Sequence, residues 1–392
     1  MDVKKDKQLT DDLLYLVWCS LHGKCPQKER IEHMNLEQLY QVSRKNDLVP
    51  TLWPAIEAFY GKDIPQTALY QEWRTVKEKV VRKNILMDLE REKLYRWMDE
   101  KCIWHMSLKG IRLKKYYPKE LRAMADNDIL FDADFQMDVC HWFEKQGYQV
   151  EMIGKSNHDV YCKEPIYNFE MHTLLYGEDH DLVWKEYYQN VKEKLIRAGE
   201  DTYEYTFDRE EEYVYLLTHF YKHYYGSGTG LRSLVDIAVY RKQYPDLQKG
   251  KIRKSCEILG LTEFEEMVER LTDQLLATDE SKIIADVSEK DVDVLLYMTF
   301  AGTYGNYNIY VQNSLKKLKG ECEEAGWKLR CRYIWNRLFP DYEWIRKGYP
   351  RLGRYHVLKP LLYLYRLLRA VIVRRKRVWK EMEILNRESR HL

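Results

Sequence analysis

The sequence predicts an α+β fold, in which a small mixed sheet lies between an N-terminal and a C-terminal helical region. Short apolar runs of strand length alternate with helical segments between residues 101 and 180. On both sides of that stretch, apolar residues recur at three- and four-residue spacing, which is typical of helices that bury one face. Strands and helices mixed within so short a stretch favour a compact α/β core with helices packed on its sheet.

The chain is expected to divide into four segments. Its 392 residues are enough for two or three domains and a sizeable core. We expect a helical N-terminal region at 1–100, an α/β core at 101–180, a helical domain at 181–340 and a basic helical tail at 341–392.

The apolar pattern also predicts individual elements. Residues 72–101 should form one long charged helix, and its apolar side should carry Val76, Val80, Ile85, Leu86, Leu89, Leu94 and Trp97. Strands are expected at 102–108, 129–131, 148–152, 160–162 and 166–175, with a helix at 136–146. Further helices are expected at 213–225, 231–240, 251–259, 263–277, 292–297 and 359–383.

A pair of aspartates at the start of a predicted strand is the most informative motif. Asp126 and Asp128 are two positions apart, so a strand directs both side chains to the same face. They follow a turn at Lys109-Gly110. Two carboxylates beside such a turn suit a divalent metal ion that holds a nucleoside triphosphate. Taken alone, however, Asp-x-Asp is common in proteins that bind no metal.

The context of this pair resembles a known family. The stretches that carry the similarity are Leu108-Lys109-Gly110, Leu113, Tyr117-Pro118, Arg122, Met124 and Asp126-x-Asp128-x-Leu130. Together they resemble the signature of an uncharacterised bacterial nucleotidyltransferase family of the polymerase-β-like superfamily. Weaker similarity continues at Asn168-Phe169-Glu170-Met171-His172, Leu216-Leu217-Thr218-His219, Arg232-x-x-x-Asp236-Ile237, Arg354-Tyr355, Leu358-x-Pro360-Leu361 and Arg366.

The resemblance implies a polymerase-β-like core and a catalytic metal site. Asp126, Asp128 and Glu170 are expected to bind Mg²⁺ (or Mn²⁺), and Glu170 could instead act as general base for an incoming hydroxyl. The Lys109 ammonium and the Gly110 backbone are expected to hold phosphate. For Glu170 the alternative is an exposed residue on an edge strand, and for Lys109 it is a solvated turn lysine.

Two positions depart from the family pattern. Ile111 follows Gly110, where the superfamily usually has a second Gly or a Ser, so the grip on the triphosphate is in question. Asn127 separates the aspartates, where the family usually has an aliphatic residue. Because Asn127 should face away from the metal, this change concerns core packing more than chemistry.

Other candidate residues are Arg122 and a helical group downstream. Arg122 could reach a phosphate or form an ion pair with a helix terminus. His219 and His223 are four positions apart, so they share a helix face. With His172, Arg232 and Asp236 they are candidates for an acceptor cleft, whereas a core histidine is the plainer alternative for His219. The glycine-rich stretch 226–230 lacks the Lys-Ser/Thr ending of a P-loop and no strand precedes it, so it is interpreted as a connection between helices.

Composition shows no sign of several classes of protein. The net charge of +2 gives no overall signature of nucleic-acid binding. The eight cysteines are scattered without a C-x-x-C pair, as in reduced cytosolic proteins. No signal core and no transmembrane run is visible, so a cytoplasmic location is expected. The basic tail, with apolar residues between its arginines, could dock on a membrane surface or an acidic partner, or simply pack on the domain.

The function predicted from these observations is Mg²⁺-dependent transfer of a nucleotidyl group from a nucleoside triphosphate. The acceptor stays open among a small molecule, a sugar, a protein hydroxyl and an RNA end. The alternative is a non-catalytic nucleotide-binding or protein-interaction module that retains the same fold. The three acidic residues favour an enzyme, and the unusual glycine turn favours the alternative.

Overall fold

The computed structural model describes residues 3–154, 156–177, 181–278, 287–305, 307–321, 326–340, 345, 359–372 and 375–388. The chain forms two compact units. The first comprises residues 1–221 and 230–303, and the second comprises residues 222–229 and 304–392. The first unit contains the sheet and most of the helices, and the second is helical where it is described. The predicted α+β class with a small mixed sheet and flanking helices is confirmed.

Five helices precede the sheet in the first unit: α1 (Val3–His22), α2 (Lys28–His33), α3 (Leu36–Lys45), α4 (Val49–Tyr60) and α5 (Ala68–Glu100). The α1 helix packs against α4 and also against the later helix α13 (Glu289–Ala301). In that contact Thr10 donates a hydrogen bond to Thr299 (3.2 Å). The N-terminal helices are therefore joined to helices that follow the sheet in the sequence.

The long helix α5 is confirmed, but the prediction of its apolar side is wrong in part. Ile85 and Leu89 are about half exposed, whereas Leu94 is buried as expected. The buried face carries Tyr70, Trp73, Asn84, Met87, Glu90, Leu94 and Met98. Both carboxylate oxygens of the buried Glu90 are hydrogen-bonded, and the buried Asn84 donates from its amide nitrogen to the Arg122 carbonyl, whereas Asn84 Oδ1 has no partner among the described residues. Apolar residues occur on more than one side of this helix, so the pattern alone did not identify the side that packs.

The five-stranded sheet has the order β1-β2-β5-β4-β3. The strands are β1 (His105–Ser107), β2 (Asn127–Phe131), β3 (Gln149–Met152), β4 (His158–Lys163) and β5 (Tyr167–His172). The pairing of β2 with β5 is parallel, and the other three pairings are antiparallel. The chain therefore crosses from β2 through α7 (Gln136–Lys145) and the β3–β4 hairpin before β5 returns beside β2.

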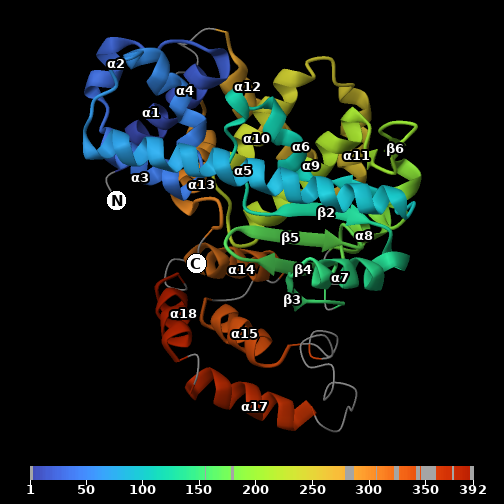
Figure 1. Ribbon diagram of the computed structural model, residues 1–392. Coiled ribbons are helices and arrows are strands. Elements are labelled where there is room, and N and C mark those ends of the chain that lie inside the picture. Colours follow the sequence, from blue (N-terminus) through green and yellow to red (C-terminus); the bar gives the residue numbers. More distant parts are fainter. Residues whose placement is uncertain are drawn as a thin grey trace. The chain divides into compact units, whose positions relative to one another are not determined.

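One face of this sheet forms the core of the α/β region. Ile129, Phe131, Phe169 and Met171 alternate along β2 and β5, and all four are fully buried. They pack with residues of α5 and α7, which Figure 1 shows lying along the sheet. Because side chains alternate across a strand, the intervening residues Asp128, Glu170 and His172 point to the opposite face. The sheet thus has an apolar face and a polar one.

Further helices complete the first unit. After α6 (Lys109–Leu113), which follows β1, come α8 (Leu182–Tyr188), a small hairpin of β6 (Ile196–Arg197) and β7 (Tyr205–Thr206), α9 (Arg209–Tyr225), α10 (Leu231–Gln243), α11 (Lys249–Leu259) and α12 (Thr262–Leu276). A bidentate pair between Arg112 and Glu212 joins α6 to α9 (2.5 and 2.7 Å). That pair brings the N-terminal half of α9 close to the Lys109 turn.

The described part of the second unit contains α14 (Tyr307–Glu321), α15 (Gly326–Leu338), α17 (Lys359–Ile372) and α18 (Arg375–Glu388). Its core centres on Val311, Leu315 and Leu385. The tail predicted as one helix at 359–383 is described as two, α17 and α18. The expected family residues Arg354, Tyr355 and Leu358 lie outside the described residues. Within the described residues, no helix is both long and apolar enough to span a membrane.

Candidate functional site

Three carboxylates gather on the polar face of the sheet. The parallel pairing places Asp128 directly opposite Glu170, so their side chains share a face. Asp126 lies one residue before β2, and its charge interacts with those of Asp128 and Glu170. We call Asp126, Asp128 and Glu170 the acidic cluster. The structure thus brings together the three residues that the sequence suggested as metal ligands.

Lys109 reaches this cluster from the turn after β1. Its Nζ lies 3.0 Å from Asp128 Oδ2 and 2.9 Å from His219 Nε2, to which it donates a hydrogen bond. Lys109 begins α6 with φ of 34°, a left-handed backbone conformation that non-glycine residues rarely adopt. The Leu108 amide donates to the Asp128 carbonyl (2.9 Å). The turn and the acidic strand are therefore held side by side.

His172 contacts the other side of Asp128. Its Nε2 lies 3.0 Å from Asp128 Oδ1 and 3.9 Å from Glu170 Oε2. His158, on the neighbouring strand β4, has its Nε2 3.7 Å from the same Glu170 oxygen. The expected cleft residues His172 and His219 thus both lie at the acidic cluster, and His158 joins them without having been predicted.

The pKa values of the acidic cluster are shifted in different directions: those of Asp126 and Glu170 are raised and that of Asp128 is lowered. Burial, followed by repulsion from Asp128, raises the pKa of Asp126 to about 6. The same causes, with a further contribution from Asp126, raise the pKa of Glu170 to about 7. Burial alone would raise the pKa of Asp128 too, but Lys109 and His172 hold it well below its usual range. The negative charge of this cluster is therefore only partly balanced, and a cation would stabilise it.

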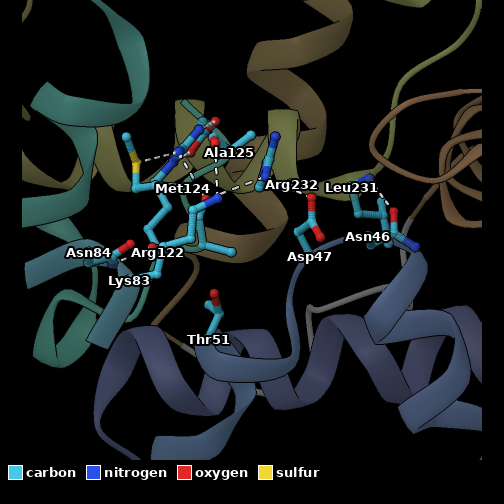
Figure 2. A network of polar contacts seen from close by, with 12 residues as sticks. Asn46, Asp47, Thr51, Lys83, Asn84, Arg122, Met124, Ala125, Leu231 and Arg232 are labelled. Carbon is cyan, nitrogen blue, oxygen red and sulfur yellow. Dashed lines mark hydrogen bonds and ion pairs between the residues drawn. The ribbon is translucent and has the colours of Figure 1, made fainter. Parts of the chain in front are cut away.

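The loop that leads into Asp126 is held by side chains from both sides (Figure 2). From the N-terminal helices, Thr51 donates to the Leu121 carbonyl (3.0 Å), Asn84 to that of Arg122 (2.9 Å) and Lys83 to that of Ala125 (2.9 Å). From α10, Arg232 donates to the Ala123 carbonyl (3.4 Å). We call Thr51, Lys83, Asn84 and Arg232 the carbonyl clamp. Outer contacts of this kind fix the position of site residues.

Arg122 lies in an ion pair inside the fold. Its Nε and Nη2 donate to the two carboxylate oxygens of Asp236, both at 2.7 Å. Tyr117 donates a further hydrogen bond to Asp236 (2.6 Å). Only 8% of the Arg122 side chain is exposed, so its guanidinium is not placed to receive a phosphate. Of the two interpretations considered, an ion pair describes Arg122, although Asp236 lies within α10 and not at its end.

Gly110 has a structural reason to be glycine. A Cβ atom at this position would lie 2.6 Å from Arg122 Nη1 and 3.0 Å from the Met124 side chain. Gly110 is itself buried. The Leu-Lys-Gly turn therefore accommodates the Arg122–Asp236 pair, which explains why these residues occur together. A phosphate-binding role for the Gly110 backbone has no support from these contacts.

The remaining predicted cleft residues are engaged elsewhere. Arg232 pairs with Asp47 (2.9 Å) in addition to its contact with the clamped loop, and Figure 2 shows this pair next to the loop. Asp236 is occupied by Arg122. His223 falls within residues 222–229 of the second unit.

Several residues that shape the site belong to no pattern that marks them in the sequence. His158 stands in no recognisable motif, and its place was set only when β4 paired with β5. Asn84 lies in the middle of a charged helix, where an amide is usually solvated. Burial of Asn84 would have indicated its role, because a buried amide needs a hydrogen-bond partner. The apolar pattern of α5, however, did not show that the side carrying Asn84 is buried.

Comparison with known proteins identifies the family. A family model described as "Uncharacterised nucleotidyltransferase" matches residues 32–277. This stretch runs from α2 through the sheet to α12 and includes the acidic cluster and the carbonyl clamp. No curated protein and no solved structure matches the chain. The match supports nucleotidyl transfer as the general activity. Because it spans more than half of the chain, this protein belongs to the uncharacterised nucleotidyltransferase family.

Proposed function

We propose that this protein transfers a nucleotidyl group from a nucleoside triphosphate to an acceptor hydroxyl or phosphate, with Mg²⁺ bound by Asp126, Asp128 and Glu170. The observation that carries the proposal is the parallel pairing of β2 with β5. It sets Asp128 opposite Glu170, on the sheet face that the apolar core leaves free for polar groups. Family membership supplies the reaction class, and the cluster supplies the residues.

The donor set fits a magnesium ion. Mg²⁺ prefers carboxylate oxygens and bridges them to phosphate oxygens of a substrate. Burial, followed by repulsion from Asp128, raises the pKa values of Asp126 and Glu170 to about 6 and 7, and a divalent cation bound by these carboxylates would favour their charged forms. When bound, magnesium would neutralise the triphosphate and stabilise the charge that develops during phosphoryl chemistry.

The protein's own groups have distinct roles in this reaction. The acceptor oxygen forms a bond to the α-phosphorus, the bond from that phosphorus to the bridging oxygen breaks, and pyrophosphate leaves. Glu170 has an alternative role: if it does not bind the ion, its pKa of about 7 suits a group that accepts the proton of an acceptor hydroxyl near neutral pH. Lys109 is charged, because Asp128 and Asp126 raise its pKa against the opposing effect of burial. We assign Lys109 to a phosphate oxygen of the triphosphate.

His219 is proposed to orient Lys109. Its Nε2 accepts the hydrogen bond from the Lys109 ammonium (2.9 Å), so the ring lies at the cluster and not in the remote core. We also propose, as the sequence suggested, that His172 and His219 help to bind the acceptor. Loss of the His219 ring should lower transfer more than it lowers nucleotide affinity, because misplacement of a group costs rate first.

The proposal is tested with the full-length protein and α-labelled nucleoside triphosphates. We expect pyrophosphate release that requires Mg²⁺ and is lost in Asp128→Asn. The matched control is Asp134→Asn, since Asp134 is exposed and lies after β2. Nucleotide binding that is equally tight with and without Mg²⁺, or turnover that survives Asp128→Asn, would overturn the proposal.

One observation favours the non-catalytic alternative. Asp128 is already engaged by Lys109 and by His172, so its carboxylate is satisfied within the protein. A nucleotide-binding module that kept the fold would show Mg²⁺-dependent nucleotide affinity without pyrophosphate release for any acceptor class. The same assay therefore distinguishes the two functions.

We also propose that α17 docks on an anionic membrane surface. Leu361, Leu364, Leu368 and Ile372 follow helical spacing and are each more than half exposed. Residues 359–380 contain eight Lys or Arg and no Asp or Glu. An apolar helix face with basic neighbours and no acidic ones matches an interfacial helix on anionic lipid.

Vesicle sedimentation tests this docking. The full-length protein should bind vesicles of phosphatidylcholine with phosphatidylserine and not vesicles of phosphatidylcholine alone, and salt should weaken the binding. The double variant Leu364→Glu with Leu368→Glu should lose it, whereas Val81→Glu on α5 should not. Equal binding to both vesicle types, or none, would contradict the proposal.

A further inference from the structure

Two histidines and a glutamate converge beside the acidic cluster. His158 and His172 are directly opposite each other where β4 pairs with β5, and their ring centroids are 4.9 Å apart. Both Nε2 atoms approach Glu170 Oε2, at 3.7 and 3.9 Å. One ligand atom from each of the three residues lies within 4.8 Å of the others. In a tetrahedral metal site with bonds of about 2.1 Å, the donor atoms are roughly 3.4 Å apart. The three side chains therefore need to move only slightly closer together to bind an ion.

Asn157 fixes the orientation of the His158 ring. Its Nδ2 donates to the carbonyls of Leu174 (3.0 Å) and Leu175 (3.1 Å), which decides which end of the amide is oxygen. The Asn157 Oδ1 therefore faces His158 Nδ1 (3.3 Å) and accepts a hydrogen bond from the Nδ1–H group. In the neutral ring this leaves the lone pair on His158 Nε2, the atom that faces Glu170.

This arrangement is the usual support for a metal-ligating histidine. Such a ring donates its second N–H to a protein oxygen, which sets the tautomer and aims the other nitrogen at the ion. Asn157 is itself buried, with 7% of its surface exposed, so the support is rigid. A pair of surface histidines would not need it.

His172 links this group to Asp128. Its Nε2 lies between Asp128 Oδ1 (3.0 Å) and Glu170 Oε2 (3.9 Å). In the structure it donates a hydrogen bond to Asp128, whose oxygens can only accept. Binding of an ion at His172 Nε2 would require the Nε2 proton to move to Nδ1, which lies 3.4 Å from the Asn157 amide nitrogen. The ion would then replace the hydrogen bond to Asp128 and leave Asp128 Oδ1 open to another cation.

We propose that His158, Glu170 and His172 bind one divalent transition-metal ion, such as Zn²⁺ or Co²⁺, in addition to the magnesium proposed for the acidic cluster. Two imidazoles with one carboxylate suit transition metals, whereas Mg²⁺ prefers oxygen ligands throughout. This inference does not depend on catalysis. It requires the three ligands and the orientation of His158 by Asn157.

Cobalt is the probe that tests it. Full-length protein without an affinity tag is stripped with chelator and titrated with Co²⁺ while the ligand-field absorption is recorded. We expect one ion per chain, no displacement by a large excess of Mg²⁺, and displacement by Zn²⁺, because softer imidazole sites bind zinc more tightly than cobalt.

Variants identify the ligands. His158→Ala should lower Co²⁺ affinity at least tenfold, while the matched His141→Ala should not change it, since His141 is exposed on α7 and outside the group. His158→Gln serves as a second variant, and thermal unfolding confirms that each protein is folded. Unchanged affinity in both His158 variants, or no Co²⁺ absorption in the parent, would overturn the proposal.

A separate arm distinguishes this site from the proposed activity. Asp126→Asn should keep the Co²⁺ absorption, because Asp126 is not among the three ligands, but should weaken Mg²⁺-dependent nucleotide binding. Loss of cobalt binding with normal nucleotide turnover would reject the transition-metal site alone. Retained cobalt binding without nucleotide turnover in the parent protein would reject the nucleotidyltransferase proposal alone.

Discussion

The Arg122–Asp236 pair and the Lys109–Asp128 pair are two buried ion pairs in one unit, yet their surroundings differ. Arg122 and Asp236 make a bidentate contact at 2.7 Å, and Tyr117 completes it. Lys109 and Asp128 meet at 3.0 Å, but Asp126 and Glu170 add two further carboxylates. The first pair is balanced in charge and the second is not.

The difference separates structure from chemistry. A balanced, fully hydrogen-bonded pair holds segments together, because loss of either partner leaves a buried charge. An excess of negative charge destabilises the fold and is retained where a cation or substrate offsets it. Both pairs belong to the stretch that resembles the family signature. The signature therefore combines residues that hold the fold together with residues whose charges suit a chemical role.

The largest expected effect is on the balanced pair. Arg122→Ala should lower the free energy of unfolding by about 3–5 kcal/mol, because Asp236 would stay buried without its partner. Urea denaturation measures it. The control is Arg44→Ala, whose pair with Glu72 is about half exposed and should be worth less than about 1 kcal/mol. Equal losses in the two variants would remove the distinction drawn above.

The second expected effect is a gain in the free energy of unfolding, not a loss. Asp126 has a folded-state pKa of about 6, above the ordinary value of 3.8 for an aspartate. Between these values the folded state holds a proton that the unfolded state has lost, so stability falls as pH rises. Asp126→Asn should therefore stabilise the protein at pH 7 by on the order of 2 kcal/mol, and the gain should shrink towards pH 4.

This pH dependence involves the groups that face Asp126. Asp128 raises its pKa, and Lys109, Arg232 and Arg122 lower it. Urea unfolding at several pH values, with Asp134→Asn as the exposed control, measures the effect. A destabilised Asp126→Asn at neutral pH would show that the carboxylate contributes to folding, which would weaken the contrast between the two pairs.

The third effect concerns the carbonyl clamp. Asn84→Ala removes the donor to the buried Arg122 carbonyl and should cost about 1–2 kcal/mol, since an unsatisfied carbonyl remains. If the clamp positions Asp126, turnover should fall more than nucleotide affinity does. Thr75→Ala, at an exposed site on the same helix, is the control. A loss of stability with unchanged turnover would leave the clamp a purely structural feature.

The smallest effect is the pH dependence of magnesium affinity. Protons compete with Mg²⁺ for Glu170, whose pKa is about 7, so affinity should rise by less than tenfold from pH 6 to pH 7 and then level off. Calorimetry gives both the affinity and the protons released. Glu170→Gln should flatten this rise, whereas a rise that is unaltered in the variant would assign the proton to another group.

Local sequence patterns predicted part of the site. Two-residue alternation predicted that Asp126 and Asp128 share a face and that Asn127 faces away, and Asn127 does bond to the Met87 carbonyl of α5 (3.3 Å). The role of Glu170 came from the family resemblance and not from spacing. Its position beside Asp128 depends on parallel pairing across 42 residues of chain, which no local pattern encodes.

The errors have a common cause. Arg122 and Asp236 are 114 positions apart, so the sequence could show that Arg122 is charged but not what it pairs with. The face of α5 that packs was likewise set by the sheet and the loop it supports. His158 drew no attention because its meaning depends on His172, which only strand pairing brings opposite it.

The sequence by itself determined many of the elements, the α+β class, the family and the presence of an acidic strand, because all of these follow from residues close together in the chain. The tertiary structure decided which charges meet. It gave Arg122 a balanced partner, left the acidic cluster with excess negative charge and placed two histidines against Glu170. Charge interactions depend on distance in space and on burial, and the chain acquires both only when distant segments pack.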